Sequence, residues 1–167
     1  MRNTVTVLTV VSALALAGCA SKPKELPPQP SGVEGPTQPQ GPTGPVAGSN
    51  ADFMAQMQGR NVIYFDTDKF DIDADDVNAL RAQAEWLQRY PSKRATIEGH
   101  CDERGTRDYN IALGERRANA AKNYLVSLGI DASRLTTVSY GKERPVALGS
   151  NESAWAQNRR AATITID

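Results

Sequence analysis

A stretch rich in proline, glycine, glutamine and serine at residues 20–51 most constrains what this chain can fold into. It contains almost no large apolar side chains, so it cannot bury enough surface to offset the entropy lost on ordering. Its glycines do not recur at every third position, which excludes a collagen-like helix. We therefore expect a disordered linker up to residue 51, and residues 52–167 remain to form one folded domain.

The first 18 residues have the composition of a secretory signal, because Arg2 gives a positive start and residues 5–17 form an apolar run. This run is shorter than the roughly 20 residues that a membrane-spanning helix needs, so we interpret residues 1–18 as a cleaved signal peptide. Leu16-Ala17-Gly18-Cys19 resembles the lipobox of bacterial lipoproteins. The resemblance implies lipidation of Cys19 and, since no Asp follows it, sorting to the outer membrane, with residues 19–51 as lipidated N-terminus and linker.

The chain has two cysteines, Cys19 and Cys101. An exported protein with two cysteines usually pairs them, but acylation of Cys19 would exclude that disulfide. Cys101 would then be either a buried small apolar residue or an exposed thiol open to oxidation. We expect it to be buried.

Hydrophobic patterning in residues 52–167 predicts alternating strands and helices. Runs of β-prone residues or strict alternation predict four strands, at 62–65, 95–99, 136–140 and 162–166. Apolar residues at helical spacing predict two main helices, at 77–87 behind acidic residues and at 107–128 between Thr106 as N-cap and a terminal Gly129, with room for a short helix at 152–158. This order predicts an α/β fold, a two-layer sandwich of a mixed four-stranded sheet and two main helices.

The charges of the chain balance, with 19 Lys and Arg against 19 Asp and Glu. A protein that binds nucleic acid usually carries a basic excess, so we expect no nucleic-acid partner.

The most informative segment runs from the end of the second predicted strand, at residue 99, into the long helix. Asn110, Leu113 and Arg117 share one helix face, at positions i, i+3 and i+7. Asp102 in the preceding turn and Arg117 together would suit a zwitterion, the carboxylate accepting from an ammonium and the guanidinium gripping a carboxylate. The alternative is an ion pair between Asp102 and Arg117 that only holds the turn to the helix, and spacing alone favours it.

The segment GHCDERGTRDYNIALGERRANA, with FDTDKFDI before it and VSYGKERPV and NRRA after it, resembles the peptidoglycan-associated lipoproteins of the Tol-Pal system, whose C-terminal domain is OmpA-like. The resemblance implies non-covalent binding of diaminopimelate in the peptidoglycan stem peptide, with Asp102 and Arg117 as principal ligands. It also implies that further residues line the site: Arg104, Gly105, Thr106, Asn110, Leu113, Phe65, Asp66 and Asp68.

The same resemblance implies a lipoprotein of the cell outer membrane that faces the periplasm and tethers that membrane to the wall. TolB and TolA are the implied protein partners, and the implied role is envelope integrity and outer-membrane invagination during division. No enzymatic activity and no cofactor are expected.

Three rival interpretations of the motif are weaker. Asp102 and Glu103 could form the carboxylate pair of a glycosidase, but adjacent residues tend to point apart and Arg104 would keep both ionised. His100, Cys101 and Asp102 could ligate a metal, but three consecutive residues rarely satisfy tetrahedral geometry, and we expect His100 to be a structural hydrogen-bonding residue. Flagellar-stator and porin-type proteins carry the same domain with additional membrane segments, and the lipobox favours a lipoprotein instead.

Overall fold

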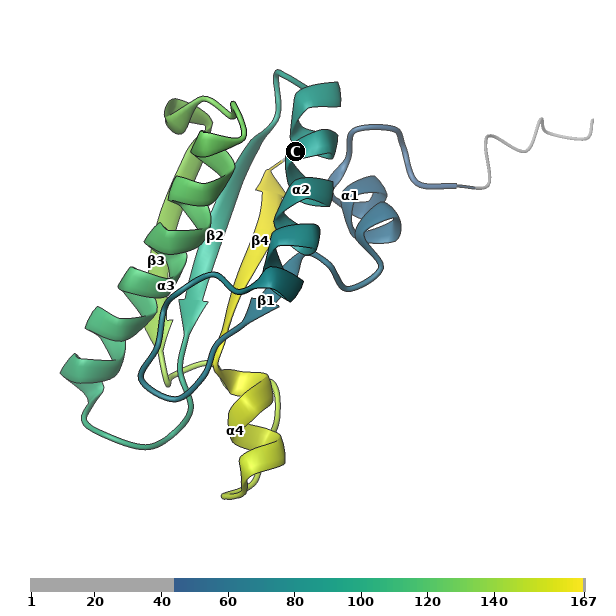
Figure 1. Cartoon of the computed structure of the whole chain (residues 1–167). Coiled ribbons are helices and arrows are strands. Elements are labelled where there is room, and N and C mark those ends of the chain that lie inside the picture. Colours follow the sequence, from purple (N-terminus) through teal and green to yellow (C-terminus); the bar gives the residue numbers. More distant parts are fainter. Residues whose placement is uncertain (1–43, 167) are drawn as a thin grey trace, which may run out of the picture. The chain divides into compact units, whose positions relative to one another are not determined.

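The computed structural model describes residues 44–166, so the signal peptide, Cys19 and most of the predicted linker lie outside the described residues. The described part is a four-stranded sheet with its main helices packed against one face (Figure 1). Its helices are α1 (Asn50–Met57), α2 (Ala74–Arg89), α3 (Arg107–Ser127) and α4 (Glu152–Asn158). Its strands are β1 (Val62–Tyr64), β2 (Arg94–His100), β3 (Leu135–Gly141), preceded by a short 3-10 turn, and β4 (Arg160–Ile166).

The sheet has the strand order β1-β4-β2-β3. β2 and β3 are parallel, whereas β4 runs antiparallel to both β1 and β2, which confirms the predicted mixed sheet. Because β4 is antiparallel, its first residue lies beside the last residues of its neighbours, and Arg160 pairs with Tyr64 while Ala161 pairs with Gly99. The loops after β1 and β2 and the segment before β4 therefore meet at one end of the sheet.

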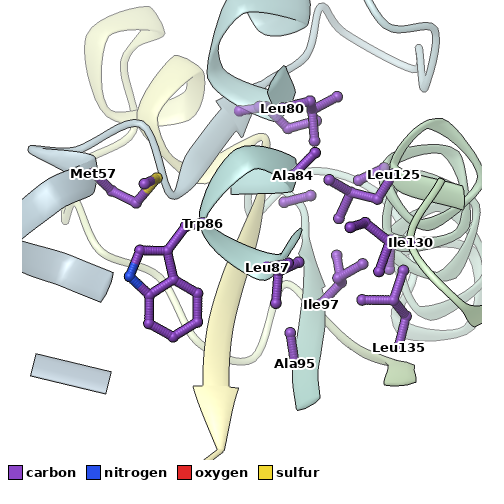
Figure 2. Close-up of a cluster of buried hydrophobic side chains, with 14 of the residues drawn as sticks. Met57, Leu80, Ala84, Trp86, Leu87, Ala95, Ile97, Leu125, Ile130 and Leu135 are labelled. Atoms are coloured by element: carbon purple, nitrogen blue, oxygen red, sulfur yellow. The ribbon is translucent and has the colours of Figure 1, made fainter. Parts of the chain in front are cut away.

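The core lies between the sheet and α2 and α3 (Figure 2). Leu80 and Leu87 come from the predicted face of α2, Leu125 from the apolar stripe of α3, and Ile97 from the inner face of β2. Each of these side chains is fully buried, and burial of one such side chain contributes roughly 1.5–3 kcal/mol. The two helices thus hold the sheet from one side and fix where its end loops emerge. Among residues 44–166, no helix is long and apolar enough to cross a membrane.

Helix α1 is the α-helix of the described residues that the sequence patterns did not predict. Ser49 caps its N-terminus, and Phe53 and Met57 are buried four positions apart on one face. The Phe53 ring meets the edge of Trp86 at a centroid distance of 5.0 Å, which docks α1 on α2. Because the helix starts at Asn50, the last two residues assigned to the linker belong to ordered structure.

α3 lies unusually close to β2, because glycines face each other at the contact. A Cβ atom on Gly99 would lie 1.8 Å from the carbonyl oxygen of Gly114, and one on Gly114 would lie 2.4 Å from Ser139 Oγ. No side chain fits between the two backbones. This close approach carries the buried face of α3, including Arg117, directly onto the end of the sheet.

Candidate functional site

A cavity of about 300 Å³ opens at the end of the sheet where the loops meet. Its lining comes from the loop after β1, the turn after β2, the first half of α3 and the residue before β4: Thr67, Asp68, Cys101, Asp102, Arg104, Gly105, Tyr109, Asn110, Leu113, Arg117 and Arg159. The structure thus brings most of the predicted site residues together. We call this space the first cavity.

The turn between β2 and α3 is held by local hydrogen bonds. Thr106 is the N-cap of α3, as predicted, and its Oγ1 accepts from the backbone N–H of Tyr109 at 3.3 Å. Asn110 donates through Nδ2 to the carbonyls of Arg104, at 2.7 Å, and of Thr106, at 3.0 Å. Gly105 takes a left-handed φ of 83°, which favours glycine. Thr106 therefore shapes the turn and does not line the first cavity.

Asp102 is buried and paired with two arginines. Arg104 donates to it through Nε at 3.0 Å and Nη2 at 2.7 Å, and Arg159 Nη1 lies 3.5 Å from its Oδ2. Burial alone would raise the pKa of the Asp102 carboxyl, but the hydrogen bonds from Arg104 outweigh it and hold that pKa below its usual value. In the described part of the chain Asp102 forms no ion pair with Arg117. The alternative interpretation, in which these two residues pair only to hold the turn to the helix, is therefore wrong.

Arg117 is fully buried, with no exposed surface. Its guanidinium donates to three backbone carbonyls, those of Lys69 at 2.9 Å, His100 at 2.8 Å and Asp66 at 3.0 Å. The guanidinium carbon also lies 5.1 Å from the centroid of the Phe65 ring. Arg117 therefore ties the loop after β1 to the end of β2 while it lines the first cavity.

Asp68 faces the same cavity from the loop after β1. Its backbone adopts a left-handed conformation, with a φ of 58°, and its Oδ1 accepts from the hydroxyl of Tyr109 at 3.0 Å. No Lys or Arg nitrogen of residues 44–166 lies within ion-pairing distance of it. Asp68 is thus the cavity carboxylate whose charge is not neutralised by an adjacent arginine.

Arg159 is a site residue that the sequence analysis did not single out. Its guanidinium donates to the Phe65 carbonyl at 2.9 Å and to Glu152 Oε1 at 2.6 Å, besides its contact with Asp102. It belongs to the NRRA segment that carried the resemblance, but only the antiparallel pairing of β4 places that segment beside the end of β2. That pairing is a tertiary feature, which the local sequence pattern does not encode.

Arg159 also borders a second cavity, of about 310 Å³. Its lining contains Phe65 and Asp66, two residues that were predicted to line the site but do not line the first cavity. The Asp66 carboxylate is mostly exposed and pairs with Lys69 at 2.9 Å. The predicted site residues of this loop therefore line two cavities, Asp68 the first and Phe65 and Asp66 the second.

Comparison with known proteins shows the family of this chain. The model of the OmpA family matches residues 64–159, which include the loops and helix around both cavities. A peptidoglycan-associated lipoprotein of Rhizobium meliloti is 50% identical over 166 residues, covering 98% of this chain and 88% of the relative. The chain belongs to the OmpA family. The predicted resemblance is thereby confirmed.

Solved structures show the same OmpA-family fold. The crystal structure of the peptidoglycan-associated lipoprotein from Burkholderia pseudomallei matches with a TM-score of 0.62 and 42% identity, covering 63% of this chain and 89% of that one. The C-terminal domain of Helicobacter pylori MotB matches with a TM-score of 0.59 at 19% identity, over 64% of this chain and 84% of that one. The second likeness, at low identity, concerns the fold alone.

Arg104, which lines the first cavity of this OmpA-family domain, stacks on the side chain of Trp155. The guanidinium of Arg104 lies 4.2 Å from the Trp155 ring centroid, and the indole N–H of Trp155 donates to Glu103 Oε1 at 3.0 Å. Hydrogen bonds from Ser150 and Trp155 hold the pKa of Glu103 below its usual value. A glycosidase needs a carboxylic acid with a raised pKa, and neither Asp102 nor Glu103 meets that requirement.

Cys101 is buried behind the turn, as expected, and its thiol donates to the Asn110 carbonyl at 3.3 Å. Burial raises the pKa of the thiol, which keeps it protonated. Its Sγ therefore packs as a small apolar group beside the first cavity.

His100 differs from its predicted role as a hydrogen-bonding residue. It is buried and stacks on Tyr140 at 5.6 Å. Its Nε2 lies 3.5 Å from Glu98 Oε2, but within residues 44–166 neither ring nitrogen makes a hydrogen bond. Burial and the charges of Arg160 and Arg144 lower its pKa to about 4, so the ring is neutral. A bulge in the pairing of β2 and β3 at Gly99/His100 accompanies this placement. In residues 44–166 no group of three or more His, Cys, Asp or Glu side chains is arranged to hold a metal.

Proposed function

We propose that the chain is a lipoprotein whose OmpA-family domain binds the diaminopimelate residue of the peptidoglycan stem peptide without doing chemistry on it. The observation that carries this proposal is the first cavity, where the carboxylates of Asp68 and Asp102 and the buried guanidinium of Arg117 line one space. The peptidoglycan-associated lipoproteins that are similar to this chain over most of its length support it.

The ligand chemistry follows from the paired charges. The side chain of diaminopimelate ends in one carbon that carries both an ammonium and a carboxylate, so its site needs acceptors and cationic donors close together. The first cavity offers both kinds of group, and its volume of about 300 Å³ suits one amino-acid side chain. A ligand with only one of the two charges would leave part of the lining unpaired.

The carboxylates of Asp68 and Asp102 have different partners and therefore different roles. Asp102 already shares its oxygens with Arg104 and Arg159, so its role is to fix the turn and hold these guanidiniums in place. Asp68 has only the neutral hydroxyl of Tyr109 as a partner. We therefore assign the ligand ammonium to Asp68, with Asp102 as second acceptor, and the ligand carboxylate to Arg117.

The cellular role follows from the two ends of the chain. Acyl chains on Cys19 would hold the protein in the outer membrane while the domain faces the periplasm and grips the wall. Anchoring of many copies raises the effective concentration, so the attachment is strong even where each contact is weak. Participation in the Tol-Pal system with TolB and TolA, and support of division, rest on the family resemblance.

Asp68→Asn tests the site with little disturbance of the fold. Asparagine tolerates the left-handed backbone at this position and keeps an oxygen for the Tyr109 hydroxyl, so the substitution removes only the charge. Asp71→Asn is the matched control, because Asp71 lies in the same loop but does not line the first cavity. Loss of one charge-assisted hydrogen bond, worth about 1.5–3 kcal/mol, predicts at least roughly tenfold weaker binding for Asp68→Asn.

The measurement is titration calorimetry with the soluble alanyl-glutamyl-diaminopimelate tripeptide, paired with sedimentation of sacculi. The Asp71→Asn protein should bind like the wild type in both assays. Equal binding by the Asp68→Asn protein would contradict the assignment of the ammonium to Asp68. Release of muropeptides from sacculi by the wild type would contradict the proposal of binding without catalysis.

A further inference from the structure

The second cavity lies next to the first and shares Arg159 with it. Its walls come from the end of β1, the N-terminus of α2 and one face of α4: Tyr64, Phe65, Asp66, Asp73, Ala156 and Gln157. Its volume of about 310 Å³ equals that of the first cavity within a few per cent. The proposed function uses only the first of these two spaces.

The groups that line the second cavity favour one kind of ligand. Tyr64, at the end of the edge strand β1, is 51% exposed and provides an aromatic ring. Asp66 and Asp73 provide carboxylate oxygens and Gln157 provides an amide. The guanidinium of Arg159 is buried and engaged with Phe65, Glu152 and Asp102, so it offers little charge to a ligand here.

These charges disfavour an anionic occupant. A ligand carboxylate in the second cavity would face Asp73 and an Asp66 that Lys69 already pairs. Arg159, the cation in the lining, is engaged with Glu152 and Asp102. A neutral ring with hydroxyl groups meets no such penalty, because its hydroxyls donate to carboxylates and its C–H face packs on an aromatic ring. The lining therefore fits a saccharide ring.

We propose that the second cavity is a saccharide subsite, which takes one sugar ring of the glycan strand whose stem peptide occupies the first cavity. This inference rests on the proposed function. Two amino-acid residues separate the sugar from diaminopimelate in the stem, and they span up to roughly 7 Å when extended. Arg159 lines both cavities, so a ligand that occupies both would pass over this residue.

Two soluble probes separate the subsite from the first cavity: the tripeptide alone, and the same tripeptide joined to its N-acetylglucosaminyl-N-acetylmuramyl disaccharide. The full chain, purified in detergent, is titrated with each probe. Packing of a sugar on an aromatic ring predicts that the wild type binds the disaccharide probe about three- to tenfold more tightly. Tyr64→Ala should abolish this preference without changing the affinity for the tripeptide, and Tyr64→Phe should retain it.

The matched control is Phe70→Ala, which removes another exposed aromatic ring that lines neither cavity and should leave the preference intact. Equal affinity of the wild type for both probes would overturn the subsite, as would an unchanged preference in Tyr64→Ala. Weakening of both probes to the same extent by Tyr64→Ala would also overturn it, because Tyr64 would then act through the first cavity. Failure of the wild type to bind the tripeptide contradicts the proposed function itself.

Discussion

Replacing Arg117 with alanine removes a side chain that stabilises the fold and, as we propose, binds the ligand. The lost guanidinium donates to the carbonyl of His100 inside the protein and to those of Asp66 and Lys69 in partly buried surroundings. A buried carbonyl left without a donor costs about 1–3 kcal/mol, while water can replace the other two bonds at a smaller cost. With the lost packing against Phe65, we expect the free energy of unfolding to fall by about 3–5 kcal/mol.

The Arg117→Ala protein should remain folded at room temperature, and its lower stability should be measurable on denaturation. A small domain typically has an unfolding free energy of about 5–15 kcal/mol, and a loss of 3–5 kcal/mol lowers the melting temperature by roughly 10–20 °C at this size. Urea and thermal denaturation followed by far-ultraviolet circular dichroism would measure both quantities. Binding of the tripeptide should be assayed at a temperature where the variant is fully folded.

Arg116→Ala is the control for the Arg117 experiment, because Arg116 is exposed and its guanidinium carbon lies 5.8 Å from the Phe70 ring centroid. Its loss should change the free energy of unfolding by less than about 0.5 kcal/mol. If Arg117→Ala melts within about 2 °C of the wild type, the three carbonyl bonds do not stabilise the fold and our reasoning about Arg117 is refuted.

Burial raises the pKa of Asp76 to about 6 from its ordinary 3.8, so the folded protein holds this proton more tightly than the unfolded chain does. The free energy of unfolding of the wild type should therefore fall as the pH rises from about 4 to about 6. The Asp76→Asn protein should not show this fall when urea midpoints are compared at pH 4 and pH 7. Gly114→Ala should destabilise by about 1–3 kcal/mol in urea denaturation, because its Cβ would meet Ser139 Oγ at 2.4 Å; a gain in stability from helix propensity would contradict the close contact. Cys101 should resist a thiol reagent in the native protein and react fully in urea, and rapid native labelling would show that the thiol is accessible.

The elements that could be predicted from the sequence are those with strong local patterns. Leu80 and Leu87 on one face of α2 indicated that helix, and α4 forms at the residues where a short helix had room. α1 was missed because its pattern consists of only Phe53 and Met57 at the end of a polar segment. Two apolar residues four apart are too weak a periodic signal, and the helix is stabilised by packing on Trp86, far along the chain.

The candidate site was predictable in its members but not in its arrangement. The motif placed Asp102 and Arg117 near one turn, and both line the first cavity. The bonding partners of these residues come from distant segments, since Arg117 donates to a carbonyl 51 positions earlier and Arg159 to one 94 positions earlier. Such contacts depend on strand order and pairing, which a single sequence does not reveal.

The two tryptophans of this chain lie in different physical environments. Trp86 is buried between Phe53 and Tyr90 in the core, whereas Trp155 is partly exposed under the guanidinium of Arg104, a residue that lines the first cavity. The indole of Trp86 should emit at short wavelength and change only when the core opens. The emission of Trp155 should change when a ligand in the first cavity contacts Arg104, which stacks on this indole. The molecule thus carries two separate fluorescent reporters, one for unfolding and one for occupancy of the site.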